Sequence, residues 1–531
     1  MKRRAFLTAQ LAGTLAAAHG AALARPRLGK HPAPHAPALR LGPAERFNFD
    51  ALLRRARVLA TQPYVPPKPP APQLVQAIDF DQVQQIRFRP ACALWAGQRH
   101  RLPVRFFHLD RLNNLPVRIF ALDGDQAREV LYSSQCFDYG KSGLPHDLPP
   151  QLGFSGFRVM DNGRDETDWL AFQGASYFRS SGQDGQYGAS ARGIAVNSAM
   201  SIKEEFPRFS SFWLAQDDIP GAPVEIYALL EGPSVTGAYH FVVHRQDAVI
   251  MEVRAEVFMR ADVQRIGLAP LTSMYWYGEN ERDRATDWRP EIHDSDGLAM
   301  WTGRGERIWR PLIDPPTLQM NAFMDDHPKG FGLMQRDRDF DHYQDDGAFY
   351  NRRPGIWVEP VGDWGKGSVQ LAEIPTEDET HDNIVAYWTP LAAVRKGAHL
   401  SAQYRLYWQD SEPQWTAGLA KAVATRLGRG GVPGQPRPED AGTVKFVIDF
   451  EGGALVQMAQ RFDVEAVVSG DHFKVEHPYV IKVVGTPRWR AVFDAAFDGK
   501  GPFNLRCFLR LGDKTLSETW LYQYFPGSVI R

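Results

Sequence analysis

Three segments of the sequence combine carboxylates with arginine, histidine and aromatic residues in patterns that could perform acid–base chemistry. They span residues 288–297, 336–353 and 373–383. Residues 373–382 hold five acidic residues and neither lysine nor arginine. Like charges that lie close together raise one another's pKa. A carboxylic acid that stays protonated near neutral pH can act as a general acid, so these segments are the first candidates for a catalytic site.

The residues alone leave three interpretations of these segments open. Two carboxylates from different strands could flank a glycosidic bond, one as general acid and the other as general base. Asp-rich loops could bind Ca²⁺, although the sequence has no EF-hand spacing. The segments could also be solvated turns, because Asp-Gly pairs favour turns. His293, His342 and His381 are 49 and 39 residues apart, which gives only weak support to a zinc site.

Tryptophan is concentrated in the same part of the chain. Eight of the fourteen tryptophans lie between Trp276 and Trp408, and Trp357 is near the middle of this stretch. Aromatic rings pack against the C–H faces of sugars, while carboxylates and arginines bind their hydroxyl groups. We interpret the cluster with its charges as a carbohydrate-binding cleft, although any single tryptophan could instead fill a hydrophobic core.

The composition sets the class of protein that must position these residues. The chain has 531 residues, of which 44% are hydrophobic, and its formal net charge is −1. This composition excludes general disorder, and the balanced charge argues against a general nucleic-acid binder. The 46 glycines, 39 prolines and 12% aromatic residues favour a turn-rich all-β protein.

The N-terminus reads as an export signal. A basic start at Lys2–Arg4 precedes a short apolar run, and Ala22-Leu23-Ala24 fits a small-x-small cleavage site. The adjacent Arg3 and Arg4 favour a twin-arginine signal over a Sec signal that happens to contain two arginines. We therefore predict that residues 1–24 are removed and that the mature protein, without a membrane-spanning segment, resides in the periplasm.

Three regions follow the signal peptide. We predict a large β-sandwich over residues 25–408, beginning with a Pro-rich stretch and one helix marked by Phe49, Leu52, Leu53, Ala56 and Leu59. Residues 409–440 are expected to form a linker with a short helix over 416–427 and a Gly-rich loop over 428–434. Residues 441–531 give about seven strand signals, which suit an immunoglobulin-like sandwich in architecture, although its disulfide–tryptophan signature is missing.

The three cysteines indicate little. Cys92, Cys136 and Cys507 allow at most one disulfide, and an oxidising compartment would permit it. We expect all three to be ordinary buried cysteines. The Gly-rich loop lacks the Lys-Ser/Thr ending of a phosphate-binding loop, and the sequence contains no Gly-x-Ser-x-Gly motif. No residue pattern indicates an organic cofactor or a metal.

Several long motifs resemble the periplasmic glucan biosynthesis D/G proteins, and the twin-arginine leader favours the D type. The matching motifs are Ser273–Asn280, Trp288–Gly297, Phe340–Gly347, Tyr350–Pro354, Gly365–Val369 and Ile374–Trp388. The resemblance covers the whole mature chain. It implies a galactose-mutarotase-like β-sandwich joined to an immunoglobulin-like domain. It also implies a role in making osmoregulated periplasmic glucans, whose backbone is β-1,2-linked glucose.

The resemblance further implies a glycoside hydrolase or transglycosylase that acts on β-1,2-glucan with inversion. Asp382 would be the general acid and Asp294 the general base, with Asp378 and Asp296 as alternatives at each position. Tyr350 and Arg353 would position the sugar. The other expected substrate-binding residues are Trp276, Trp357, His293, Asp296 and Asp378. The alternative is a non-catalytic glucan-binding factor that organises the membrane glucan synthase, with the C-terminal domain as its docking module.

Overall fold

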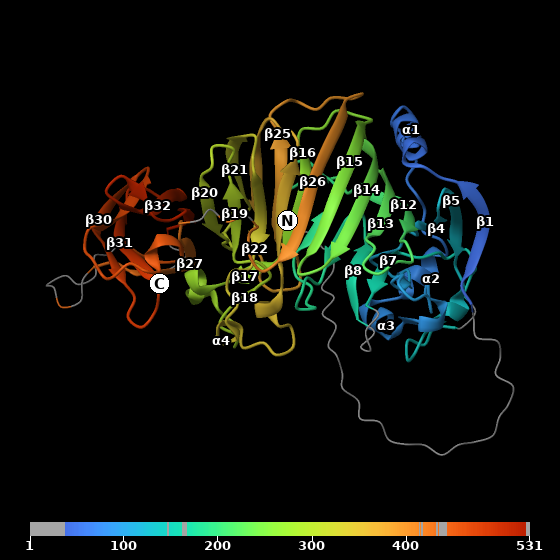
Figure 1. Ribbon diagram of the computed structural model, residues 1–531, viewed down its shortest axis with the longest axis horizontal. Coiled ribbons are helices and arrows are strands. Elements are labelled where there is room, and N and C mark those ends of the chain that lie inside the picture. The colour runs from blue at the N-terminus through green and yellow to red at the C-terminus, as the bar shows by residue number, and fades with distance from the viewer. Residues whose placement is uncertain are drawn as a thin grey trace, which may run out of the picture. The chain divides into compact units, whose positions relative to one another are not determined.

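The computed structural model describes residues 38–145, 148–161, 167–413, 415, 418–431, 434 and 443–526. The expected signal peptide and the first part of the Pro-rich stretch lie outside the described residues. The structure confirms an all-β fold of facing sheets, with few and short helices (Figure 1). The finer resemblance to galactose-mutarotase-like sandwiches stays a prediction.

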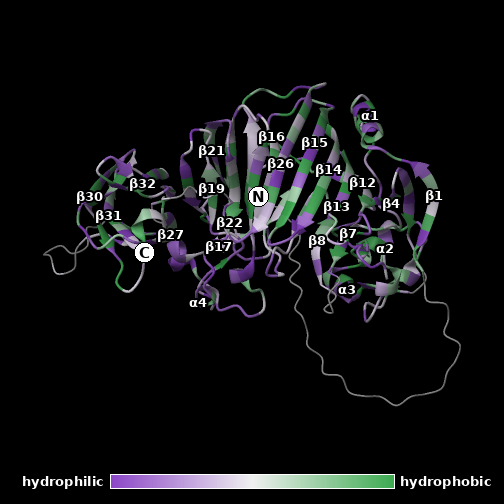
Figure 2. Cartoon of the chain, in the orientation of Figure 1, coloured by the Kyte–Doolittle hydropathy of each residue, from purple (hydrophilic) through white to green (hydrophobic). Residues whose placement is uncertain are grey.

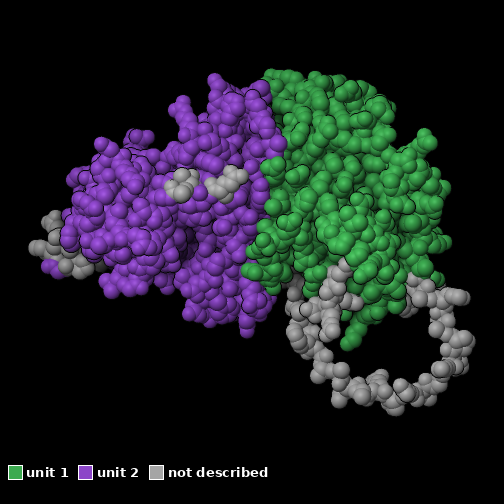
Figure 3. Space-filling model, in the orientation of Figure 1, with its two compact units in different colours: residues 1–269, 393–406 green, residues 270–392, 407–531 purple. Residues whose placement is uncertain are grey.

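The chain forms two compact units, coloured separately in Figure 3. Unit 1 comprises residues 1–269 and 393–406, and unit 2 comprises residues 270–392 and 407–531. The predicted boundaries at 408 and 441 stay predictions, since these units divide the chain at other places. All three acid-rich segments belong to unit 2.

One helix of unit 1 follows its sequence signals closely. Helix α1, Phe49–Ala60, begins where the side chain of Asn48 accepts a hydrogen bond of 2.8 Å from the amide of Ala51. Leu52 and Ala56, one helical turn apart, are buried and face strands β14 and β15. The helix predicted from the apolar spacing is therefore confirmed.

Two sheets build unit 1. The first has the strand order β1 Arg40–Arg46, β5 Gln126–Leu131, β4 Arg118–Asp123, β12 Arg208–Ala215, β13 Val224–Glu231, β14 Val235–Arg245, β15 Val249–Met259 and β26 His399–Gln409. The second has the order β16 Ile266–Ser273, β10 Ser190–Arg192, β9 Tyr177–Ser180, β8 Asp168–Gln173, β7 Gly156–Met160 and β3 Val104–Phe107, and β11 Ala195–Val196 pairs with β16.

Alternation along the strands explains why this part of the chain forms sheets. In β13 the buried Val224, Ile226 and Ala228 alternate with the more exposed Glu225 and Tyr227. Side chains that alternate between core and solvent are typical of half-buried strands, and Figure 2 shows the resulting bands along β14 and β15. The remaining elements of unit 1 are α2 Pro72–Ala77, α3 Phe80–Gln85, η1 Pro90–Cys92, η2 Ser134–Cys136, and the paired β2 Arg87–Phe88 and β6 Phe137–Asp138.

A disulfide in unit 1 corrects one expectation. Cys92 and Cys136 are bonded, with their Cα atoms 5.6 Å apart, so they are not ordinary buried thiols. Each cysteine ends a single turn of 3₁₀ helix, and the pairing of β2 with β6 brings the two turns together. Sequence reasoning missed this pair because the partners are 44 residues apart. Cys507 is free and buried, as expected.

Unit 2 contains three main sheets. One has the order β23 Gly355–Val361, β22 Gly330–Met334, β19 Gly297–Trp301, β20 Arg307–Pro311, β34 Thr519–Tyr524, β32 Phe503–Leu511 and β29 Val464–Gly470, with β33 Lys514–Thr515 beside β32. Another has the order β21 Gln319–Asp326, β24 Lys366–Glu373 and β25 Ile384–Pro390. The third has the order β27 Lys421–Arg429, β28 Thr443–Glu451, β31 Trp489–Phe497 and β30 Phe473–Lys482.

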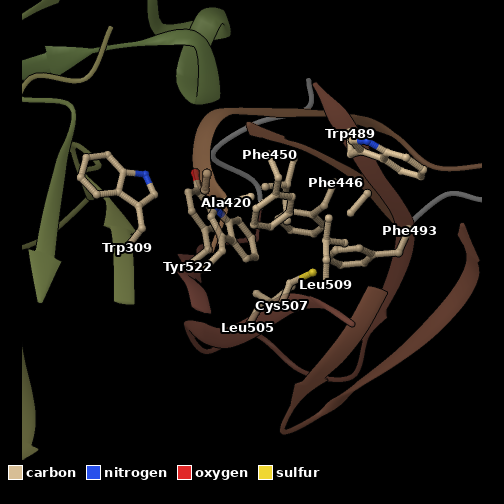
Figure 4. Packing of buried hydrophobic residues seen from close by; sticks show 14 of the residues in the cluster. Trp309, Ala420, Phe446, Phe450, Trp489, Phe493, Leu505, Cys507, Leu509 and Tyr522 are labelled. Atoms are coloured by element: carbon tan, nitrogen blue, oxygen red, sulfur yellow. The ribbon is translucent and has the colours of Figure 1, made fainter. Parts of the chain in front are cut away.

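The C-terminal strands form the expected sandwich. Strands β28 to β34 are seven strands close to the predicted positions. The sheet β27–β28–β31–β30 faces β34–β32–β29 across a core that includes Phe446, Phe493, Leu505 and Leu509 (Figure 4). Burial of these side chains supplies the main driving force for the packing of the two sheets.

The helix expected over residues 416–427 is wrong for its described C-terminal part. Residues 421–429 form β27, which pairs antiparallel with β28. Ala422 is buried in the C-terminal core and Ala424 is also buried, and the sheet pairing overrides the helical propensity of this Ala-rich run. Gly428 and Arg429 of the expected loop therefore belong to a strand, while residues 432–433 lie outside the described residues.

Candidate functional site

A short ladder positions two of the predicted carboxylates. Strand β17, Tyr275–Tyr277, pairs with β18, Ile292–His293, and the amide of Asp294 donates a hydrogen bond of 2.8 Å to Met274. The side chain of Asn383 accepts from the amide of Tyr275 and donates to its carbonyl, both at 2.8 Å. Asp294 is thus anchored to Met274, just before β17, and Asn383, the residue after Asp382, is anchored to Tyr275, the first residue of β17.

Asp294 forms a buried ion pair with Arg353. The two residues are 6% and 7% exposed, and Arg353 Nη1 donates to the carboxylate of Asp294. The guanidinium lies 4.1 Å from the ring centroid of Tyr350. Burial alone would lower the pKa of Arg353, but Asp294 and Tyr350 outweigh it, so this pKa is raised. Arg353 thereby holds Asp294 in one orientation at the turn η4, Tyr350–Arg352.

Arg289 joins all three acid-rich segments. Its Nη1 lies 2.8 Å from a carboxylate oxygen of Asp345 and 2.8 Å from one of Glu379, and Nη2 reaches the second oxygen of Glu379 at 3.1 Å. The hydroxyl of Tyr350 donates to the same Glu379. A planar guanidinium can bind several carboxylate oxygens at once, which fixes the three segments against one another.

A pocket with about 420 Å³ of empty space lies beside this cluster. We call it the acidic pocket. It is lined by Tyr275, Gly278, Glu279, Asn280, Glu291, His293, Asp296, Trp309, Pro311, Arg336, Asp337 and residues 422–425 of β27. The lining carries four carboxyl groups, and its guanidinium, on Arg336, is already bound by Glu412 and Glu518.

Two carboxyl groups of the acidic pocket, those of Asp296 and Glu279, have raised pKa values. Burial raises the pKa of Asp296 to about 6, despite hydrogen bonds from the amides of residues 336 and 337. Burial raises the pKa of Glu279 to about 8, opposed by Arg426. Burial would lower the pKa of His293, but Glu291, 3.1 Å from its Nε2 atom, raises it. Such groups can exchange protons near neutral pH.

One group among the described residues could hold a metal ion. Ligand atoms of Glu291, Asp337 and His342 lie within 4.8 Å of one another. His342 Nδ1 is 2.6 Å from an oxygen of Asp337, and Glu291 is hydrogen-bonded to His293. Because hydrogen bonds of this kind account for the cluster, we assign it no metal, and the absence of a metal from the reaction stays a prediction.

Asp378 and Asp382, the two predicted candidates for the general acid, differ in their surroundings. Asp378 is exposed, and its carboxylate caps a local turn by accepting from the amide of Thr380 at 2.8 Å. Hydrogen bonds from Thr380 hold the pKa of Asp378 below its usual range. Asp382 is partly buried and is separated from the start of β25 by Asn383. These surroundings suit Asp378 to stabilising the loop and Asp382 to the site.

Trp357 does not contact the site and corrects the prediction that it binds substrate. Its side chain is 1% exposed and belongs to a hydrophobic core cluster. A Cβ atom on Gly330, in the adjacent strand, would lie 2.3 Å from the Trp357 ring. The ring therefore packs flat over a glycine, where no sugar can reach it.

Four of the eight tryptophans in this cluster are buried in the core, and one of them, Trp309, also lines the acidic pocket. Trp309, Trp357, Trp388 and Trp408 are between 0% and 4% exposed. Trp276 is partly exposed and packs edge-on against Tyr277, with ring centroids 5.1 Å apart. Trp288 is 71% exposed beside Arg289, so it offers a free ring face close to the acid-rich segments. Only the tertiary packing separates these two groups of tryptophans.

Tyr350 and Arg353 are also placed differently from the expectation that they bind sugar. Tyr350 is 2% exposed, and the main partners of both side chains are carboxylates of the site. Sequence reasoning gave no individual role to Arg289, Glu379 or Glu279. The only signal for Arg289 was its position as the single arginine in the acid-rich segment 288–297.

The fold and this site belong to a known class of protein. Residues 47–524 match the model of the family described as Periplasmic glucan biosynthesis protein, MdoG. The chain therefore belongs to this family, which functions in periplasmic glucan biosynthesis, and the resemblance found in the sequence is confirmed. No helix in the described part of the chain is long and apolar enough to span a membrane.

Curated relatives of the D type match almost the whole chain. It is 48% identical over 538 residues to Glucans biosynthesis protein D 2 of Ralstonia nicotianae, which covers 99% of this chain and 98% of the relative. It is 47% identical to Glucans biosynthesis protein D of Stenotrophomonas maltophilia, over 92% of this chain and 91% of the relative. Identity to Glucans biosynthesis protein D of Xanthomonas oryzae pv. oryzae is 46%, over 92% of each chain.

Proposed function

We propose that this protein is a periplasmic enzyme that cleaves β-1,2-linked glucan with inversion, as an endo-glucanase or a transglycosylase. The observation that carries the proposal is the convergence of the three acid-rich segments on Arg289. Family membership supports glucan as the polymer, and the sequence resemblance supports the β-1,2 linkage. The N-terminal pattern supports export through the twin-arginine route.

Asp382 is the proposed general acid. A general acid must reach the glycosidic oxygen, and the partial exposure of Asp382 allows this. Asn383 holds the preceding residue in place through its bonds to Tyr275 and to the carbonyl of Ile374 at 2.9 Å. Proton transfer from Asp382 to the leaving oxygen breaks the bond from that oxygen to the anomeric carbon.

Asp294 is the proposed general base. Its carboxylate is held in one orientation by the ion pair with Arg353. Because Asp294 is only 6% exposed, the proton of the attacking water or sugar hydroxyl reaches it directly or through an intervening hydroxyl. The hydroxyl of Tyr350, next to Arg353, is a candidate for that relay. Asp296, facing the acidic pocket, is the alternative base.

The attacking group decides the product. Water as the acceptor gives hydrolysis and a new reducing end, whereas a sugar hydroxyl gives transglycosylation or a cyclic glucan. In both cases the acceptor oxygen bonds to the anomeric carbon as the leaving oxygen departs, and inversion needs a carboxyl separation of roughly 6.5–9.5 Å. The membrane glucan synthase is a proposed partner in this scheme.

The test is turnover by purified residues 25–531 on linear β-1,2-glucan, following reducing ends and product masses. We expect Asp382→Asn to lose roughly 10²–10⁴ of the rate while keeping the wild-type melting temperature. Asp378→Asn is the matched control, because this exposed carboxylate serves a turn, and we expect it to stay within a few-fold of wild type.

Each result has a distinct meaning. New reducing ends that Asp382→Asn abolishes establish a glucanase, and products that lack one water without new reducing ends establish a cyclising transglycosylase. Near-wild-type turnover by Asp382→Asn removes this residue from the role of acid. Binding without any turnover rejects the enzyme and leaves a glucan-binding factor that organises the synthase.

A further inference from the structure

A second pocket lies wholly within unit 1. It has about 730 Å³ of empty space and is formed by residues 112–117 before β4, the turn between β8 and β9, and residues 206–212 at the start of β12. We call it the unit 1 pocket. It shares no residue with the acidic pocket.

Aromatic rings form much of its lining. Phe172, Phe209 and Phe212 are 0% to 3% exposed and pack against one another, while Phe206 at the rim is 40% exposed. The guanidinium of Arg192 lies 5.0 Å from the Phe206 ring centroid and 5.1 Å from that of Tyr177. The rim rings are thus held in place by a shared cation and can offer flat apolar faces to a ligand.

Fixed hydrogen-bonding groups accompany the rings. Gln173 Nε2 donates to Ser155 Oγ at 2.9 Å, and Asn113 Nδ2 donates to Asp110 at 3.2 Å, so both amides are oriented. Across the described ranges, no donor reaches the side-chain carbonyl oxygen of either amide. Arg208 Nη2 donates to the carbonyl of Pro116 at 2.6 Å, which leaves its Nε and Nη1 hydrogens as open donors among the described residues.

Backbone geometry at the pocket is also unusual. Gly174 and Ala175, in the turn that lines it, have φ angles of +74° and +40°. Alanine rarely adopts a left-handed conformation, and such residues are concentrated at binding sites. The conformation is held by hydrogen bonds from Tyr177 to the carbonyl of Gly174 at 2.9 Å and from Phe209 to that of Ala175 at 3.0 Å.

The chemistry of this lining selects the class of ligand. Rings pack on the C–H faces of a sugar, and oriented amides with an arginine bind its hydroxyl groups. Among the described residues that line the pocket there is no carboxylate, which is the group that acid–base cleavage needs. We propose that the unit 1 pocket is a second, non-catalytic carbohydrate site that holds the glucan chain during its processing. This inference rests on the proposed function for the identity of the carbohydrate.

The test is calorimetric titration of Asp382→Asn, residues 25–531, with a linear β-1,2-glucooligosaccharide, so that binding is measured without turnover. We expect two sites per chain. Adding Phe206→Ala or Gln173→Ala should weaken one of them by about tenfold, because each removes a ring face or an oriented amide. Phe80→Ala is the matched control, since Phe80 is 53% exposed on α3 of the same unit but lies outside the pocket.

Turnover kinetics provide an independent measurement. Phe206→Ala in the otherwise wild-type protein should raise KM for long glucan several-fold and leave kcat and the KM for a short oligosaccharide unchanged. Melting temperatures within about 2 °C of wild type, a change expected for less than about 1 kcal/mol, establish that the variants fold.

Four outcomes are decisive. Two sites, one of them sensitive to Phe206→Ala, support the inference. A single site unaffected by the unit 1 variants, with normal turnover of wild type, overturns the inference and leaves the proposed function intact. A pocket that binds inorganic phosphate and no oligosaccharide also overturns it. Absence of both turnover and oligosaccharide binding rejects the proposed function itself.

Discussion

The acidic pocket and the unit 1 pocket differ in the groups that line them. The acidic pocket carries Glu279, Glu291, Asp296 and Asp337 together with His293. The unit 1 pocket carries phenylalanine and tyrosine rings, amides and one arginine, and no carboxylate. Titratable groups with raised pKa values can exchange protons, whereas rings and amides can only hold a ligand.

The way each pocket is held together differs as well. Ion pairs between distant segments fix carboxylates of unit 2. Arg289, for example, binds Asp345 and Glu379, which are 56 and 90 positions away in the sequence. Packed aromatic rings, the guanidinium of Arg192 and hydrogen bonds of side-chain amides fix the unit 1 pocket. A catalytic site must keep like charges together and therefore needs buried counter-charges, while a binding site does not. Each prediction below tests one side of this contrast.

The largest effect should come from breaking the ion pair of Asp294 with Arg353. Removing one partner leaves a buried charge unpaired, so Asp294→Asn or Arg353→Met should each lower the free energy of unfolding by about 3–5 kcal/mol. The double variant should recover part of this loss, with a coupling of about 1–3 kcal/mol measured by urea unfolding.

Gln173→Leu in unit 1 is the matched control for that cycle. It removes one neutral hydrogen bond to Ser155 and should lower the free energy of unfolding by only about 1 kcal/mol. Additive effects of Asp294→Asn and Arg353→Met, with no recovery in the double variant, would contradict the structural role of the ion pair. If Gln173→Leu and the single variants of the ion pair lowered the free energy of unfolding equally, the contrast between the two regions would be lost.

Trp357 and Trp288 allow a tryptophan of the core to be compared with an exposed tryptophan near the acid-rich segments. Trp357→Ala should lower the free energy of unfolding by about 3–5 kcal/mol, because a fully buried ring leaves a cavity. Trp288→Ala should change stability by less than about 0.5 kcal/mol, since its ring is 71% exposed, and should raise KM for glucan. Denaturant unfolding and steady-state kinetics of both variants measure the difference; a stable Trp357→Ala with impaired KM would reverse the assignment.

The smallest expected effect is the pH dependence of stability that Glu279 and Asp296 of the acidic pocket contribute. The folded protein binds the protons of Glu279 and Asp296 more tightly than the unfolded chain, with pKa values of about 8 and about 6. Their contribution to stability is therefore complete below about pH 4 and is lost as pH rises toward 8. The free energy of unfolding should therefore fall as the pH rises from about 4 toward 8.

Glu279→Gln tests the origin of that dependence. Glutamine stays neutral at every pH, so the variant should unfold less readily than wild type at pH 8, by on the order of 1–2 kcal/mol, and similarly to wild type at pH 5. Asn113→Ala in the unit 1 pocket is the control and should leave the pH profile unchanged. If wild type and Glu279→Gln had identical pH profiles, another group would be the cause of the pH dependence of the free energy of unfolding.

Local patterns predicted much of the fold. The apolar spacing and Asn48 predicted helix α1, and the alternation of apolar and polar residues predicted strands such as β13. Both predictions work because helices and strands impose their own periods on buried residues. The three acid-rich segments were singled out as candidates for a site, and the structure joins them through Arg289, while their role in a site stays a prediction. The signal peptide lies outside the described residues and stays a prediction.

Other features could not be predicted because they depend on distant partners. Pairing with β28 makes residues 421–429 a strand despite their helical composition. The disulfide of Cys92 with Cys136 depends on which turns the fold brings together. The burial of Trp357 depends on a glycine in the neighbouring strand.

The sequence by itself determined the all-β class, the family and the residue types that carry the proposed chemistry. These follow from composition, short-range periodicity and long motifs, which are written in consecutive residues. Only the tertiary structure decided which carboxylate each arginine holds, which tryptophans reach solvent, and that a second, carboxylate-free pocket exists in unit 1. The physical reason is that burial and ion pairing are properties of residues brought together across the chain, and their energies depend on the surroundings that folding creates.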